Sequence, residues 1–207
     1  MEAVGREQAI QYAIQWLEYS LRQPQTESTA TELGQPTPEL RPIAWGAKVS
    51  PTFRERVLWI EQDLGINADY LMACMAWESG ESFSPSKKNM AGSGATGLIQ
   101  FMPSTAKALG TTTAELARMT PEDQLNYVWK YFAPFDGRLK NLGDVYMAIL
   151  WPKAVGKTDD YVLFDRGIAY RQNAGLDKDK NGKVTRGECI TKIQEKLAKG
   201  LLPANLG

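Results

Sequence analysis

The helical pattern that begins at residue 50 constrains the fold more than any other feature of the sequence. Ser50-Pro51 and Thr120-Pro121 each place an N-capping side chain before a proline at the first helical position, and Asn67 can cap a further helix. Strand-type alternation of Val and Ile is scarce. We therefore predict a mainly α fold with at most a small sheet. The predicted helices cover 51–64, 68–79, 103–109, 121–132, 143–150, 159–173 and 186–199.

The first 45 residues have a different character. Apolar residues recur at spacings of three and four between Glu2 and Arg22, which predicts a helix there. The stretch from Gln23 to Pro42 is rich in Pro, Thr, Ser and Gln, a composition typical of an extended tether. We predict an N-terminal helix and Pro-rich linker over 1–45, followed by one packed domain over 46–207.

The composition excludes several kinds of chemistry. The 207 residues include no His, which removes imidazole-dependent triads and the commonest zinc ligand, so acid–base catalysis must use carboxyl groups. Cys74 and Cys189 lie too far apart in sequence for a metal knuckle or a redox pair, and we expect free thiols. The 24 basic and 24 acidic residues cancel, so no overall field favours nucleic acid or an anionic membrane.

Features of membrane insertion and secretion are missing from the sequence. No apolar run reaches the length of about 20 residues that a membrane-spanning helix needs. The segment 1–21 lacks the basic head, apolar centre and cleavage site of a secretory signal. We therefore expect synthesis in the cytoplasm and no membrane insertion. We also expect a monomer.

A carboxylate stands at the end of an apolar helical stripe. On the predicted helix after Asn67, the residues Leu71, Cys74, Met75 and Glu78 share one face. Desolvation at such a place would raise the pKa of the carboxyl group, as a general acid at neutral pH requires. The alternative is a solvated glutamate at a helix end, which the periodicity by itself favours.

A glycine-rich loop follows this helix. Between Asn89 and Ala106 the chain reads N-M-A-G-S-G-A-T-G-L-I-Q-F-M-P-S-T-A. Gly92, Gly94 and Gly97 allow backbone conformations that other residues resist, so the loop can fold close to a bound ligand. It does not have the spacing of a phosphate-binding loop, and no strand precedes it.

These two segments carry a family resemblance. Trp77-Glu78-Ser79-Gly80 and Gly94-Ala-Thr-Gly-Leu-Ile-Gln-Phe-Met-Pro103 resemble the two signature segments of the soluble lytic transglycosylases, which are related to goose-type lysozymes. The resemblance covers about residues 48–150. It implies a lysozyme-like helical fold, with the acid in the first segment and the floor of a sugar groove in the second.

The resemblance also implies roles for individual residues. Glu78 would be the catalytic acid, Ser79 a helper beside it, and Gln100 a hydrogen-bonding partner of the substrate. A third family segment is matched loosely at 145–149, where Tyr146 would orient the acid or the sugar. Met147 stands where the family usually has Asn.

The implied reaction is cleavage of the β-1,4 bond between N-acetylmuramic acid and N-acetylglucosamine in peptidoglycan, leading to bacterial lysis. A hydrolytic lysozyme (muramidase) normally needs a second carboxylate, whereas the family's transglycosylases use the C6 hydroxyl of the substrate as nucleophile. The candidates for a second carboxylate are Glu81, Asp63 and Asp69. Because Glu81 fits an exposed loop acid better, we favour the transglycosylase.

A calcium-binding pattern lies near the C-terminus. The segment 177–188, D-K-D-K-N-G-K-V-T-R-G-E, fits the EF-hand loop, with Gly182 at the sharp turn and apolar Val184 at the packing position. We expect Ca²⁺ as a structural cofactor; the alternative is an acidic turn of similar composition. The predicted ligands are Asp177, Asp179, Asn181, Lys183 through its carbonyl, Thr185 and Glu188.

The sequence leaves two function classes open. The first is the peptidoglycan-cleaving enzyme, and the alternative is a non-catalytic, calcium-dependent cell-wall-binding module. Without a secretory signal, the enzyme would reach the periplasm or cell wall as a phage endolysin, a tail-associated lysin or a secretion-system effector. The expected partners are peptidoglycan glycan strands and, for an effector, a carrier or an immunity protein.

Overall fold

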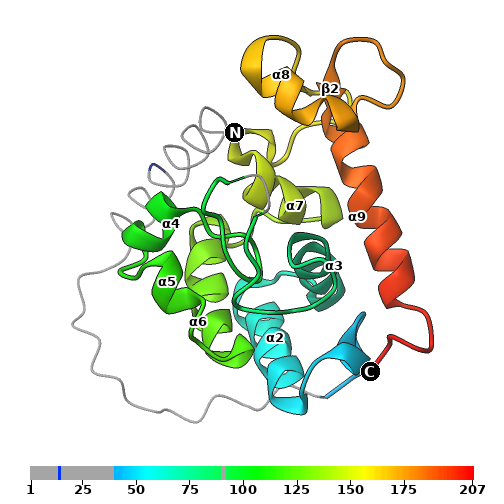
Figure 1. Ribbon diagram of the computed structural model, residues 1–207. Coiled ribbons are helices and arrows are strands. Elements are labelled where there is room, and N and C mark those ends of the chain that lie inside the picture. The colour runs from blue at the N-terminus through cyan, green and yellow to red at the C-terminus, as the bar shows by residue number, and fades with distance from the viewer. Residues whose placement is uncertain (1–13, 15–39, 90–91) are drawn as a thin grey trace.

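The structure is a computed structural model that describes residues 14, 40–89 and 92–207. The predicted helix at 2–22 and most of the predicted tether lie outside the described residues. The described part is mainly helical, as predicted, with one small sheet (Figure 1). Its α-helices are α2 (Pro51–Leu64), α3 (Ala68–Glu78), α4 (Pro103–Ala108), α5 (Thr113–Leu116), α6 (Pro121–Phe132), α7 (Leu142–Leu150), α8 (Gly167–Asn173) and α9 (Arg186–Gly200). Short 3-10 helices cover Gly46–Lys48, Ala133–Phe135, Pro152–Ala154 and Ala174–Leu176.

The predicted capping residues start the helices of the body. The Ser50 hydroxyl accepts a hydrogen bond from the Phe53 N–H at 3.0 Å, and the Thr120 hydroxyl accepts one from the Asp123 N–H at 3.1 Å. Asn67 caps α3 in the same way. These local bonds satisfy N–H groups that a helix cannot satisfy within itself, which explains why the sequence predicted α2, α3 and α6 closely.

The C-terminal helix α9 packs along α3 and also contacts α7, while α2 and α6 pack together on the other side (Figure 1). Helix α3 is therefore surrounded by other elements, and its residues Ala68 and Leu71–Ala76 are buried. A helix that is apolar on every side is typical of a core position. Glu78, the last residue of α3, is thus presented from the centre of the domain.

One predicted helix is wrong. The segment 159–173 forms strand β1 (Val162–Phe164) and then the shorter helix α8. Strand β1 pairs antiparallel with β2 (Val184–Thr185), which lies within the acidic segment 177–188. This partner lies far along the chain, so local periodicity could not reveal the strand. Helix α5 was not predicted either, although Thr112 and Glu115 form a capping box at its start.

The packed body begins earlier than the predicted boundary at residue 46. Ile43, Ala44 and Trp45 are fully buried. The Ile43 N–H donates to the carbonyl oxygen of Gly207 at 2.9 Å, and the indole Nε1–H of Trp45 donates to the carbonyl oxygen of Lys196 at 3.0 Å. The end of the predicted linker therefore belongs to the core, where it packs beside the C-terminal segment.

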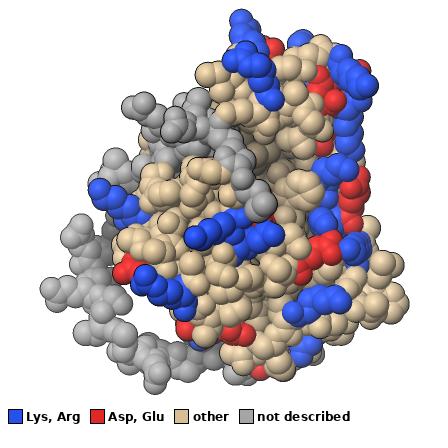
Figure 2. Space-filling model, viewed as in Figure 1, with Lys and Arg blue, Asp and Glu red and all other residues tan. Residues whose placement is uncertain are grey.

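The described residues contain no helix long and apolar enough to cross a membrane. Cys74 and Cys189 are buried free thiols, as expected. Lysine, arginine and acidic side chains are spread together over the face in Figure 2, in keeping with the zero net charge of the sequence.

Candidate active site

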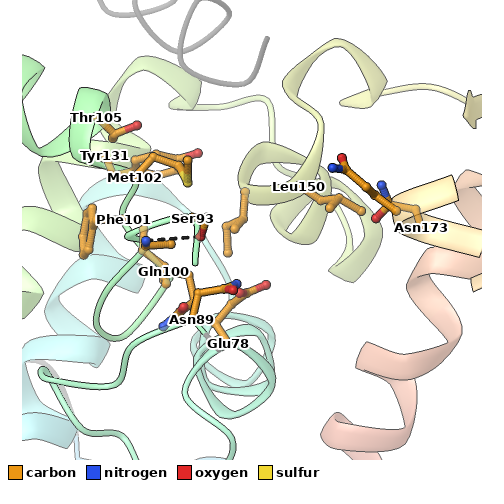
Figure 3. Close-up of a pocket in the computed structure, with 14 residues that line it drawn as sticks. Glu78, Asn89, Ser93, Gln100, Phe101, Met102, Thr105, Tyr131, Leu150 and Asn173 are labelled. Atoms are coloured by element: carbon orange, nitrogen blue, oxygen red, sulfur yellow. Dashed lines mark hydrogen bonds between the residues drawn. The ribbon is translucent and has the colours of Figure 1, made fainter. Parts of the chain in front are cut away.

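A pocket of about 230 Å³ opens above the end of α3. Figure 3 shows Glu78 at the base of this pocket, with Gln100, Met102 and Thr105 on one side and Asn173 on the other. The lining residues are Glu78, Asn89, Ser93, Ala95, Ile99, Gln100, Phe101, Met102, Thr105, Tyr131, Ile149, Leu150, Gln172 and Asn173.

The environment of Glu78 is that of a proton donor. Its side chain is half-buried at the C-terminal end of α3 and borders the pocket. Burial penalises the charged form and raises the pKa of Glu78 to about 8. At neutral pH the carboxyl group therefore holds its proton, and the pocket gives it access to a bound ligand.

Two tyrosines lie close enough to Glu78 for its charge to affect the pKa of their phenol groups. Burial, and then the charge of Glu78, raise the pKa of Tyr131 and of Tyr146. The phenol of Tyr131 lines the pocket and donates to the carbonyl oxygen of Ala148 at 2.8 Å. Both phenols thus stay neutral and surround the acid without supplying a counter-charge.

Backbone hydrogen bonds close the glycine-rich loop into a tight turn. Thr96 and Phe101 exchange two backbone hydrogen bonds, of 3.1 and 2.9 Å. Gly97 has φ 90°, and a Cβ atom added there would lie 2.3 Å from Oε1 of Gln124. Only glycine fits both the conformation and the space.

Gln124 of α6 is the buried support of this loop, and its role was not predicted from the sequence. Its side chain is fully buried; Oε1 accepts from the Leu98 N–H at 2.7 Å, and Nε2 donates to the carbonyl oxygens of Pro85 and Leu116 at 3.1 and 2.9 Å. The sequence signal for a buried glutamine was its position: Gln124 precedes Leu125 and lies one helical turn before Val128, on the apolar face of an amphipathic helix. Buried amides are usually fully hydrogen-bonded.

The predicted substrate-binding residues occupy different places. Gln100 lines the pocket, and its Nε2 donates to the carbonyl oxygens of Lys87 and Gly97, each at 3.0 Å. Ser79 is fully buried and does not line the pocket; its hydroxyl donates to the Met75 carbonyl oxygen at 2.7 Å and accepts from the Phe83 N–H at 3.0 Å. These bonds stabilise the turn after α3.

Tyr146 is also buried, at 3% exposure, and does not line the pocket. It lies in α7, where seven consecutive residues from Leu142 to Ala148 are buried. Ser79 and Tyr146 are thus both buried and absent from the lining of the pocket, and the substrate-binding roles suggested for them by the resemblance stay predictions.

The other candidate carboxylates have structural partners and do not line the pocket. Glu81 accepts hydrogen bonds from Lys196 and Lys199 of α9. These bonds lower the pKa of Glu81, and the bond from Lys196 has the larger effect. Asp63 accepts from the Trp129 indole at 2.7 Å, and Asp69 accepts from the Ala44 N–H at 2.7 Å. Among the described lining residues, Glu78 is the one acidic side chain.

The acidic loop at 177–188 gathers three carboxylates. Oxygen atoms of Asp177, Asp179 and Glu188 lie within 4.8 Å of one another. Gly182 turns the chain at φ 84°, and its N–H donates to Asp177 at 3.0 Å. The remaining predicted ligands lie in the same turn: the Lys183 N–H donates to Asn181 Oδ1 at 2.9 Å, and Thr185 caps α9.

One comparison with known proteins gives a match, and its range includes part of this site. Residues 58–150 match the family model described as Transglycosylase SLT domain. The matched segment contains Glu78, the glycine-rich loop and Tyr146, and ends at the pocket residue Leu150. The match covers less than half of the chain, and together with the mainly helical structure it supports a lysozyme-like helical fold. Neither the search of curated proteins nor the search of solved structures gives a match.

Proposed function

We propose that this protein cleaves the β-1,4 bond between N-acetylmuramic acid and N-acetylglucosamine in peptidoglycan, with Glu78 as the general acid. The observation that carries the proposal is a carboxyl group of raised pKa at the base of a pocket, inside the segment that matches the transglycosylase family. Desolvated carboxyl groups in clefts are typical of acid catalysts.

In the first step, protonated Glu78 donates its proton to the glycosidic oxygen. The bond between this oxygen and C1 of the muramic acid then breaks, and the N-acetylglucosamine end leaves as an alcohol. Positive character develops at C1 in the transition state. The Glu78 carboxylate formed in this step lies beside that charge and can stabilise it.

The second step is assigned to transglycosylation. A hydrolase would need another carboxylate to activate water or to attack C1, and Glu78 is the one acidic side chain among the described residues lining the pocket. The C6 hydroxyl of the muramic acid therefore attacks C1 and returns its proton to Glu78. The product is a 1,6-anhydromuramic acid, and the acid is ready for another turnover.

The neighbouring residues act in two ways. Gln100 contacts the substrate directly, since it lines the pocket. Tyr146 and Ser79 act as positioning residues: Tyr146 is buried close to Glu78, and Ser79 stabilises the turn that ends α3.

We further propose that the acidic loop binds Ca²⁺ as a structural ion. The oxygen atoms of Asp177, Asp179 and Glu188 lie close enough to share one ion, and oxygen is the ligand type that calcium prefers. The side chain of Asn181, the carbonyl of Lys183 and Thr185 would complete the site. The ion would hold the loop between α8 and α9 and takes no part in the chemical steps.

Delivery to the periplasm or cell wall by a phage or a secretion system is part of the same proposal, with peptidoglycan strands as the partner of a monomeric enzyme. A carrier protein would suit either route. An immunity protein covering the pocket would suit a secreted effector.

The test measures release of soluble fragments from purified peptidoglycan by wild type and Glu78→Gln. We expect the substitution to lower the rate by at least about 100-fold, because general acid catalysis commonly contributes 10²–10⁴. Glu55→Gln, an exposed glutamate on α2, is the matched control and should retain the wild-type rate. A folded Glu78→Gln protein with the wild-type rate would remove Glu78 from the mechanism, and an inactive wild type would favour the wall-binding module.

A further inference from the structure

Helix α8 supplies one side of the pocket although it lies outside the segment that matches the family. Its last two residues, Gln172 and Asn173, line the pocket with Glu78. Figure 3 shows Asn173 facing Met102 and Thr105 across the open space. The pocket therefore includes two regions far apart in the sequence, the glycine-rich loop before α4 and the end of α8.

The position of α8 is fixed from both ends. The phenol of Tyr170 donates to Asp177 at 2.7 Å, which ties the helix to the first residue of the acidic loop. Strand β1, just before α8, pairs with β2, which lies in the second half of that loop. The end of the helix is fixed by Asn173, whose Nδ2 donates to the carbonyl oxygen of Ala169 at 2.9 Å. These contacts hold the two amides at a defined place.

The segment that contains α8 and the acidic loop is also joined to helix α7 by ion pairs. Arg186, at the start of α9, is 5% exposed and forms ion pairs with buried Asp144 of α7, at 2.9 Å, and with Asp159. Helix α7 carries buried Tyr146, which lies close to Glu78, and the pocket residue Leu150 at its end. The start of α9 is therefore tied to a helix that itself contributes to the pocket.

We propose that Gln172 and Asn173 are substrate-positioning residues that bind the glycan strand from the side opposite the glycine-rich loop. This inference rests on the proposed function for the identity of the ligand. Sugar hydroxyls and acetamido groups donate and accept hydrogen bonds, and a side-chain amide can do both. The loop side combines apolar Ile99, Phe101 and Met102 with polar residues such as Ser93 and Gln100. The polar amides would thus fix how the strand lies over Glu78.

The atoms needed for this role are accessible. Gln172 is exposed at the end of α8. Asn173 uses Nδ2 to hold the helix end, and within the described part of the chain its Oδ1 accepts no hydrogen bond. The Asn173 amide can thus accept from a sugar hydroxyl or acetamido N–H without giving up its structural bond.

Binding is measured first, in a Glu78→Gln background where the ligand is not consumed. The probe is uncross-linked, soluble glycan strands prepared from peptidoglycan. Gln172→Ala and Asn173→Ala should each raise the Kd about 2- to 10-fold, as expected for one lost hydrogen bond. The matched controls are Gln62→Ala on α2 and Asn126→Ala on α6, both exposed, which should leave the Kd unchanged.

Kinetics and stability then separate substrate contact from a structural role. With Glu78 present, Gln172→Ala should raise KM and change kcat by less than about twofold, the pattern of lost substrate binding. Its melting temperature should equal that of wild type, because the side chain is exposed. If Asn173→Ala unfolds the end of α8, Gln172→Ala carries the test without it.

The outcomes distinguish the two proposals. Unchanged Kd and KM in Gln172→Ala, with wild type cleaving peptidoglycan, would overturn the α8 wall and leave the catalytic function intact. A raised Kd with an inactive wild type would support the wall and overturn catalysis.

Discussion

Glu78 owes its chemistry to the residues that precede it. Helix α3 is buried from Leu71 to Ala76, and Glu78 ends it at the border of a pocket. The sequence predicted the apolar stripe but left a solvated glutamate open as the alternative. The structure decides for a desolvated group, because α9 and α7 cover the faces of α3 that a surface helix would expose to water.

The raised pKa of Glu78 predicts a pH-dependent stability difference. The folded-state pKa of about 8 lies above the unfolded value of about 4.3, so stability is fully present below about pH 4.3 and falls as the pH rises toward 8. Glu78→Gln stays neutral and escapes this loss. By pH 7 the variant should be more stable by on the order of 2 kcal/mol, or roughly 5 °C in melting temperature.

Thermal unfolding at pH 5 and at pH 7 measures this difference, with Glu55→Gln as the control. The gap between Glu78→Gln and wild type should be larger at pH 7. A gap of equal size at both pH values would mean that Glu78 is solvated in the folded protein.

The activity should depend on the same proton. The acid is active while Glu78 is protonated, so kcat/KM should fall as the pH rises through about 8. The pH–rate profile on soluble glycan strands shows this limb. A loss of activity already complete by pH 6 would indicate an acid with an ordinary carboxyl pKa.

At the scale of the elements, the glycine-rich loop depends on the fit between Gly97 and Gln124. Gly97→Ala would place a methyl group against a fully buried amide that makes three hydrogen bonds, at a φ of 90°. We expect a loss of about 2–3 kcal/mol of stability and weaker glycan binding.

The matched control is Gly137→Ala, which has φ 68° but meets no atom within 4 Å. It should cost only about 1 kcal/mol, the strain of the left-handed conformation. Equal melting temperatures for the two variants would show that contact with Gln124 has no consequence.

The acidic loop is the second element that carries a prediction. If the loop binds calcium, the metal should increase the free energy of unfolding by about 2.7 kcal/mol at a hundredfold excess over the Kd. The melting temperature should therefore be higher in calcium than in a chelator. Asp179→Ala should remove this gain, whereas Asp136→Ala, an exposed aspartate outside the loop, should keep it. Asp179 suits the test better than Glu188, which also takes part in the capping box of α9. Replacing Glu188 would lower the stability of the protein even without a metal. Identical curves with calcium and chelator would exclude a structural ion.

The elements also show where prediction from sequence ends. Helices α2, α3 and α6 were predicted closely because Ser50, Asn67 and Thr120 cap them through bonds to residues three positions away. Strand β1 was missed because its hydrogen-bonding partner, β2, lies about 20 residues further along the chain, within the acidic loop. Local signals determine the first kind of element, and tertiary pairing determines the second.

On the scale of the whole molecule, the candidate site combines segments that the sequence keeps apart. The motifs identified Glu78 and Gln100, and both line the pocket. Sequence could not place Gln172 and Asn173 beside them, nor show that Asp63 and Asp69 are bound elsewhere by Trp129 and Ala44. These facts depend on tertiary packing, in which α2 packs against α6 and the segment before α2 bonds to α3.

The C-terminal helix connects these parts. Helix α9 starts at the acidic loop, packs along α3, and bonds through Lys196 and Lys199 to Glu81 in the turn after the acid. Glu81 is thereby used to fix the fold around the site. A carboxylate so close to Glu78 in sequence is therefore held outside the pocket.

The central claim is that Glu78 acts as a single acid in a transglycosylase. Mass spectrometry of the fragments released from purified peptidoglycan by wild type and by Glu78→Gln tests it most directly. We predict muropeptides ending in 1,6-anhydromuramic acid from wild type and none from the variant. Fragments with ordinary reducing ends from wild type would contradict the claim, because they require water to be activated by a group that the described pocket does not contain.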